Sequence, residues 1–187
     1  MPSQKIHFTG GMNLLQGKHA HDCVVLFYAN WCGFCKSFMP IYDEVADVRR
    51  NLPMYKIDLA KEKDGATYAE LLKQETGIAS SQYGIADLAK LVEGYPTTIL
   101  FLKGKWLQAN VSKKHPDGTF NVDIPGVSTF DNQVLPAEWI RPKQEAYKEG
   151  DVVECYRTHI RFVGGKSKAE LLQILNTVYG PTTMTSK

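Results

Sequence analysis

A continuous run of apolar residues is followed, a few positions later, by a stretch in which apolar residues recur at helical spacing. Residues 24–28 are all apolar and rich in β-formers, which predicts a strand buried on both faces. From residue 33 to about residue 50, apolar positions recur at steps of three and four, which predicts a helix with one buried face. That face consists of Phe38, Ile41, Tyr42, Val45 and Val48. The opposite, solvated face is expected to carry Glu44, Asp47, Arg49 and Arg50.

The rest of the pattern predicts a chain that mixes strands and helices. Further strands are expected at 5–8, 54–59, 97–102 and 159–163, and further helices at 12–16, 67–74, 80–92 and 166–179. Gly104 is expected to end the strand 97–102 in a turn. The polar stretch 181–187 predicts a disordered tail.

Length and composition narrow the class of protein. The chain has 187 residues, of which 43% are hydrophobic, so one domain with a substantial core is expected. A net charge of +2 without a basic stripe argues against nucleic acid and anionic membranes as partners. The first residues lack the apolar core of a signal peptide, and no stretch is long enough to span a bilayer. Four cysteines do not suggest a secreted disulfide scaffold, so we expect a soluble, cytoplasmic protein.

The strand 24–28 and the following helix place a pair of cysteines at their junction. Cys32 is expected at the N-terminus of the helix, and Cys35 lies one turn further on. A helix N-terminus offers partial positive charge and N–H donors, which can lower the pKa of a cysteine from about 8.5 into the range of roughly 3.5 to 7.5. Lys36 adds a nearby cation. A thiolate beside a resolving thiol is what thiol–disulfide exchange requires.

Three stretches resemble those of the thioredoxin superfamily, which includes thioredoxins and protein disulfide isomerases. Residues 27–36, Phe-Tyr-Ala-Asn-Trp-Cys-Gly-Phe-Cys-Lys, resemble the family's active-site segment. Pro40 matches the proline that kinks the active-site helix, and Tyr95-Pro96-Thr97 matches the loop with a cis proline that faces the cysteines. The resemblance implies an α/β thioredoxin fold, in which helices flank a central mixed β-sheet.

The resemblance also implies roles for individual residues. Cys32 would be the nucleophile and Cys35 the resolving thiol, and their redox-active disulfide would replace any separate cofactor. Substrate contacts would come from Trp31, Gly33, Phe34, Tyr95 and Pro96, with Lys36 in support. The expected partners are protein thiols and disulfides, with a small thiol or a flavin-dependent reductase as electron donor.

Two stretches are longer than the family's minimal fold needs. We expect 1–187 to form a single thioredoxin-like domain with a helical insertion at about 60–93 and a β-rich insertion at about 106–158. The second would contain strands at 120–124 and 151–156 and a short helix near 136–140. It could cover a sheet edge or select a partner, and the sequence leaves both roles open.

Two departures from the family pattern affect the expected chemistry. Leu26 stands where the family usually carries a buried acid that helps to move the proton of the resolving thiol, and no other carboxylate is an obvious replacement. Mixed disulfides should therefore persist longer, and Leu26→Asp should speed their resolution. The dipeptide Gly33-Phe34 replaces Gly-Pro or Gly-His, so we expect an intermediate redox potential and leave the direction of exchange, reductase or isomerase, open.

Two other classes of function remain as alternatives. The same fold could serve as an interaction module with weak or vestigial redox activity, and Leu26 is the feature that favours this. One alternative is a surface metal site formed by His19, His21 and Cys23. Another is that Cys32 and Cys35 form half of a zinc site. The chain has no second Cys-x-x-Cys, and we expect no metal. Cys23 is expected to be an inert buried thiol, and Cys155 a spare thiol or, as the alternative, part of a regulatory disulfide with another cysteine.

Overall fold

The fold was obtained as a computed structural model, and it describes residues 21–59, 67–127, 134–144 and 146–181. The described residues form two compact units: those within 1–103 and 159–187 make up unit 1, and those within 104–158 make up unit 2. Unit 2 covers nearly the same residues as the second stretch that the sequence predicts as an insertion. The expected strand 5–8, the expected helix 12–16 and most of the tail lie outside the described residues.

Unit 1 is built on a sheet in which β1 is the central strand. The strands are β1 (Cys23–Tyr28), β2 (Met54–Asp58), β3 (Thr97–Lys114) and β7 (Val152–Val163), of which β3 and β7 continue into unit 2. β1 pairs in parallel with β2 and antiparallel with β3, and β3 also pairs with β7. Every residue of β1 is buried, as its unbroken apolar run predicts.

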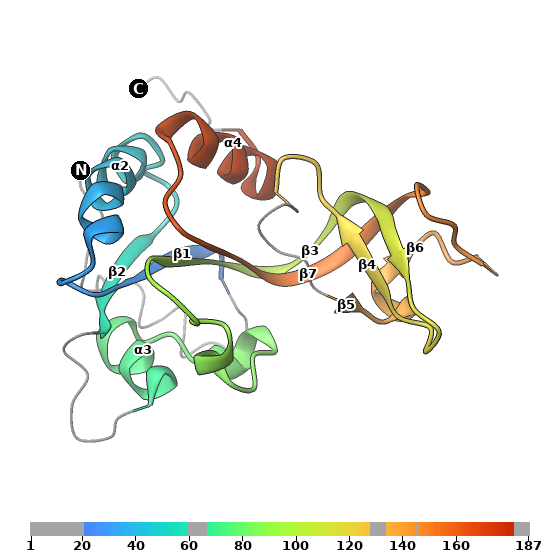
Figure 1. The fold of residues 1–187 in the computed structure, drawn as a ribbon, viewed down its shortest axis with the longest axis horizontal. Helices are drawn as coiled ribbons and strands as arrows, with labels where there is room; N and C mark the ends of the chain where they lie inside the picture. The colour runs from blue at the N-terminus through green and yellow to red at the C-terminus, as the bar shows by residue number, and fades with distance from the viewer. Residues whose placement is uncertain (1–20, 60–66, 128–133, 145, 182–187) are drawn as a thin grey trace. The chain divides into compact units, whose positions relative to one another are not determined.

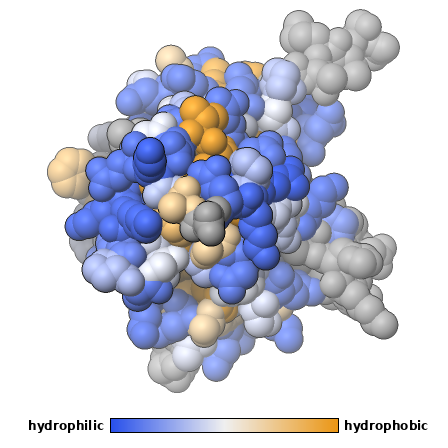
Figure 2. Space-filling model, turned by 90° about the vertical axis from the view of Figure 1, so that its right-hand side faces the viewer, coloured by the Kyte–Doolittle hydropathy of each residue, from blue (hydrophilic) through white to orange (hydrophobic). Residues whose placement is uncertain are grey.

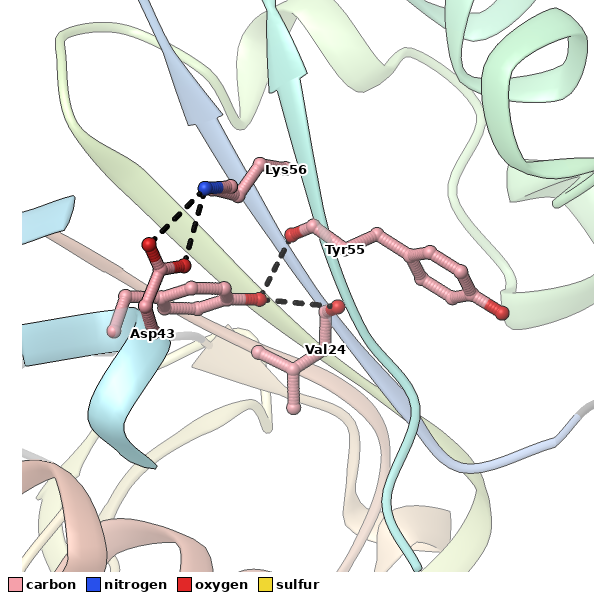
Figure 3. A network of polar contacts seen from close by, with 5 residues as sticks. Val24, Asp43, Tyr55 and Lys56 are labelled. Carbon is pink, nitrogen blue, oxygen red and sulfur yellow. Dashed lines mark hydrogen bonds and ion pairs between the residues drawn. The ribbon is translucent and has the colours of Figure 1, made fainter. Parts of the chain in front are cut away.

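In the part of the chain that the structure describes, three α-helices cover the two faces of this sheet. α2 (Gly33–Val48) and α4 (Lys168–Tyr179) lie side by side on one face, and α3 (Tyr68–Thr76) lies on the other (Figure 1). The side chains of β2 point alternately to the two faces of the sheet. Tyr55 and Ile57 belong to the core cluster that includes Leu72 of α3, whereas Lys56 points to Asp43 of α2 (Figure 3).

The predicted helix 33–50 is confirmed, but for two of its residues the predicted burial is wrong. α2 ends at Val48, which is 44% exposed although the pattern places it in the core. Arg49, expected in solvent, is 7% exposed. Its Nη1 donates to Oδ1 of Asn176 and to the carbonyl of Gly180, so the guanidinium joins the end of α2 to the end of α4. At the end of a helix, a tertiary partner outweighs the 3.6-residue period.

The predicted helix 80–92 is wrong. Two short 3₁₀ turns, η2 (Ser80–Tyr83) and η3 (Leu88–Lys90), stand in its place. Gly84 adopts a left-handed conformation with φ 75°, which ends η2, and Asp87 starts η3 by accepting the N–H of Ala89. Ile85, Leu88 and Val92 are still buried, because their burial does not need a continuous helix.

The predicted turn at Gly104 is also wrong, because β3 runs through it to Lys114. Gly104 has φ 98°, and a Cβ there would collide with the hydroxyl of Tyr156. Here the glycine admits a neighbouring side chain and does not end the strand. Tyr156 lies on β7, which is one strand where the sequence predicts two, at 151–156 and 159–163.

Unit 2 is β-rich, as expected. β4 (Phe120–Asp123) pairs with the end of β3, β5 (Val134–Leu135) pairs with β4, and β6 (Ile140–Arg141) pairs with β7. The short helix expected near 136–140 is the 3₁₀ turn η4 (Ala137–Trp139). In the face that Figure 2 presents, apolar residues emerge in small groups within a mostly hydrophilic surface.

Among the described residues, no helix is both long enough and apolar enough to cross a membrane.

Candidate active site

Cys32 occupies the position that the sequence predicts, at the mouth of α2. β1 ends at Tyr28, a short turn follows, and the N–H of Cys32 donates to the carbonyl of Ala29 at 3.0 Å. Cys32 is the N-cap residue of α2, and no side chain caps the helix there. The free N–H groups of the first helical turn are therefore directed at its sulfur.

This position makes the Cys32 thiol acidic. Burial alone would raise its pKa, since the residue is only 8% exposed. The backbone N–H of Cys35, the thiol of Cys35 and the backbone N–H of Phe34 act in the opposite direction and outweigh burial, so that the pKa of Cys32 lies below its ordinary value. A lower pKa increases the fraction of the thiolate that disulfide exchange needs.

Cys35 has the opposite character. It lies in the first turn of α2 and is fully buried. Burial raises the pKa of Cys35 to about 11, and its hydrogen bond to Cys32 and the negative charges of Cys32 and Asp58 add to the effect. The two thiols thus differ strongly in acidity although they contact one another, which matches one nucleophile and one resolving thiol.

The loop before β3 faces these cysteines, as the resemblance implies. The Cys32 thiol lies 3.7 Å from the carbonyl oxygen of Tyr95. The Tyr95–Pro96 peptide bond is cis. The loop is fixed from its other side, because the carbonyl of Pro96 accepts the N–H of Gly164 at 2.8 Å. The structure therefore brings Tyr95 next to the sulfur of Cys32.

The remaining predicted site residues surround the cysteines in different ways. Trp31 and Phe34 are 68% and 76% exposed, which is unusual for large apolar side chains. Trp31 packs edge-to-face on Tyr95, with the ring centroids 5.9 Å apart. Gly33 has open space where a Cβ would lie, and Lys36 is exposed. The surface around Cys32 is therefore apolar and accessible.

Sequence reasoning missed one residue of the site, Asp58. Leu26 is fully buried on β1, and it offers no group that could accept a proton. Asp58, the last residue of β2, is 4% exposed, and its charge raises the pKa of Cys35. Parallel pairing of β1 with β2, which places Asp58 opposite Tyr28, could have indicated this carboxylate.

The remaining candidate groups are the possible metal ligands and the two cysteines outside the pair. Within the described ranges, no group of three or more His, Cys, Asp or Glu side chains could hold a metal ion. His19, part of one metal hypothesis, lies outside those ranges. Cys23 and Cys155 are buried, and neither is in a disulfide among the described residues; burial raises the pKa of Cys23 to about 12, which agrees with an inert thiol.

Comparisons with known sequences agree with this site. The family model described as Thioredoxin matches residues 13–73. Protein disulfide isomerase-like 2-2 of Oryza sativa subsp. japonica is 37% identical over 83 residues, which cover 44% of this chain and 18% of the relative. A thioredoxin of Mycoplasmoides gallisepticum is 34% identical over 82 residues, which cover 44% of this chain and 61% of the relative. The chain thus spans less than a fifth of the first curated relatives that it matches.

Among solved structures, chloroplastic thioredoxin z aligns over 96% of both chains with 15% identity and a TM-score of 0.41. The match to the family model covers the cysteine pair. Residues 13–73 are thus similar to the thioredoxin family, and the described fold is a mixed β-sheet flanked by helices.

Proposed function

We propose that this protein is a thiol–disulfide oxidoreductase that exchanges disulfides of protein substrates through Cys32 and Cys35. The observation that carries the proposal is the contrast within the pair. Cys32 has a lowered pKa at the mouth of α2, while its hydrogen-bonded neighbour Cys35 has a pKa of about 11. The names of its relatives, protein disulfide isomerases and thioredoxins, support the same class of reaction.

The reaction begins with attack of the Cys32 thiolate on a substrate disulfide. A bond forms between the Cys32 sulfur and one substrate sulfur, and the other substrate sulfur leaves as a thiolate. Cys35 then attacks the Cys32 sulfur, which releases the second substrate thiol and leaves the Cys32–Cys35 disulfide. The substrate gains two electrons, and the pair loses them. A small thiol or a flavin-dependent reductase would return the pair to its dithiol form.

The surroundings of Cys32 suit an extended, partly apolar substrate. The carbonyl of Tyr95, 3.7 Å from the Cys32 thiol, is positioned to accept a hydrogen bond from the backbone of a bound peptide. Trp31 and Phe34 offer exposed apolar surface on which side chains beside the substrate disulfide can pack. Phe34 stands within the Cys-x-x-Cys motif, so it lies close to any captured sulfur.

Reduction of insulin disulfides by dithiothreitol, followed as turbidity, tests the proposal. The wild-type protein should accelerate the reaction, and Cys32→Ser should abolish the acceleration. Cys155→Ala, which removes a buried thiol of unit 2, is the matched control and should retain it. Cys35→Ser should accumulate mixed disulfides with substrate proteins. A wild-type rate equal to that of Cys32→Ser would contradict the proposal and favour an interaction module.

A further inference from the structure

Asp58 is a buried carboxylate at the edge of the sheet where the cysteines lie. It is the last residue of β2 and is 4% exposed. In the pairing of β2 with β1, it stands opposite Tyr28, the residue from which the chain turns towards Cys32 and α2. A carboxylate is rarely buried to this degree without a structural or chemical role.

The side chain of Asp58 belongs to the face of the sheet that α2 covers. Side chains alternate along a strand, so Asp58 shares a face with Lys56 and not with Ile57. Lys56 reaches Asp43 of α2, with its Nζ 3.1 Å from one carboxylate oxygen and 3.3 Å from the other (Figure 3). Leu26 pairs with Lys56 across the strands and so lies on this face too.

Asp58 therefore places a carboxylate on the same face of the sheet as Leu26. It lies on the neighbouring strand, two residues nearer to the ends of β1 and β2. The charge of Asp58 is among the causes that raise the pKa of Cys35, so the carboxylate acts electrostatically on the resolving thiol. The titratable groups that share this region are Cys32, Cys35 and Asp43 of α2, Lys56 of β2 and Tyr28 of β1.

We propose that Asp58 accepts the proton of Cys35 when Cys35 resolves the mixed disulfide. This proposal rests on the proposed function and deepens it. The Cys35 proton passes to the Asp58 carboxylate, the Cys35 sulfur bonds to the Cys32 sulfur, and the bond between Cys32 and the substrate breaks. The substrate sulfur leaves with the electron pair, and Asp58 afterwards gives the proton to solvent.

Asp58→Asn separates this role from a static effect of charge, because the two predict opposite signs. If Asp58 acted only as a charge, its removal would lower the pKa of Cys35 and make resolution faster. If Asp58 accepts the proton, its removal leaves Cys35 to ionise unaided, and resolution near neutral pH becomes slower. We expect a decrease of about tenfold or more.

Stopped-flow reaction of the reduced protein with Ellman's reagent measures this step. Attack by Cys32 releases one coloured thiolate, and attack by Cys35 releases a second. Because this leaving group needs no proton, the second rate reports the ionisation of Cys35. In Asp58→Asn that rate should rise about tenfold per pH unit between roughly pH 6 and 8, and in the wild type it should rise less steeply.

Two further variants exclude a merely structural effect. Leu26→Asp added to Asp58→Asn should recover most of the lost rate, because it returns a carboxylate to the same face. Glu44→Gln, which removes an exposed charge from α2, should leave the second rate unchanged.

A second rate in Asp58→Asn that equals or exceeds the wild-type rate would overturn the role of Asp58. A slower rate with the wild-type pH profile and no recovery by Leu26→Asp would overturn it as well. Wild-type protein that releases no second thiolate at any pH would instead contradict the proposed function, and this proposal would fall with it.

Discussion

The hydroxyl of Tyr42 holds the active-site helix against the sheet, and its removal has a predictable cost. Tyr42 is fully buried on α2. Its hydroxyl lies 2.8 Å from the carbonyl of Tyr55 and 3.3 Å from the carbonyl of Val24, and so joins α2 to both β2 and β1 (Figure 3). Tyr42→Phe keeps the ring and its edge-to-face contact with Phe38, but removes this donor.

The expected loss of stability follows from the number and burial of these bonds. A hydroxyl has one proton, so one hydrogen bond, shared between two acceptors, is lost. Such a bond contributes about 0.5–1.5 kcal/mol, and a buried acceptor left without its donor adds to the cost, so we expect about 1–2 kcal/mol. For a chain of this length, that corresponds to a decrease of about 2–8 °C in the melting temperature.

Urea unfolding followed by helical circular dichroism measures the loss. All three α-helices of the described residues lie in unit 1, so this signal reports the unit that contains Tyr42. Tyr55→Phe is the matched control, because it also removes one hydroxyl from a buried tyrosine but keeps the carbonyl that accepts from Tyr42, and it should change the free energy of unfolding by less than about 0.5 kcal/mol. Equal losses in the two variants would refute the reasoning.

Three further substitutions test other contacts of the fold. Arg49→Met removes the bonds to Asn176 and Gly180 and should lower the free energy of unfolding by about 1.5–3 kcal/mol in the same urea assay. Gly104→Ala should lower the melting temperature measurably more than Gly118→Ala, because both positions have positive φ but only Gly104 lies against Tyr156; equal shifts would contradict this. Ser167→Ala breaks the capping box with Glu170 at the start of α4 and should cost about 1 kcal/mol, which Ser167→Asp should largely restore.

The elements that the sequence predicts well are those whose pattern is local. The apolar run of β1, the period of α2 and the helix expected at 166–179 each depend on residues close in sequence, and all three elements are found, the last as α4. The placement of Cys32 and Cys35 followed from the junction of β1 with α2. The position of the Tyr95–Pro96 loop came from the resemblance alone, because its contact with Cys32 joins residues 63 positions apart.

The misplacement of Arg49, the turn expected at Gly104 and the overlooked Asp58 share one physical cause, a tertiary partner that the local pattern does not contain. Arg49 is buried because the end of α4 offers it two acceptors. Gly104 stays within β3 because Tyr156 occupies the space beside it. Asp58 was overlooked because its significance depends on β2 lying parallel to β1, which brings the carboxylate to the resolving thiol.

The central claim is that Cys32 is an acidic nucleophile beside a weakly acidic partner. Alkylation of the reduced wild-type protein by iodoacetamide across a pH series, with the modified cysteine identified by mass spectrometry, tests it directly. The account predicts modification of Cys32 with a midpoint clearly below the value of about 8.5 for free cysteine, while Cys35 stays unmodified at neutral pH. A Cys32 midpoint at or above that value, or equal reactivity of the two cysteines, would contradict it.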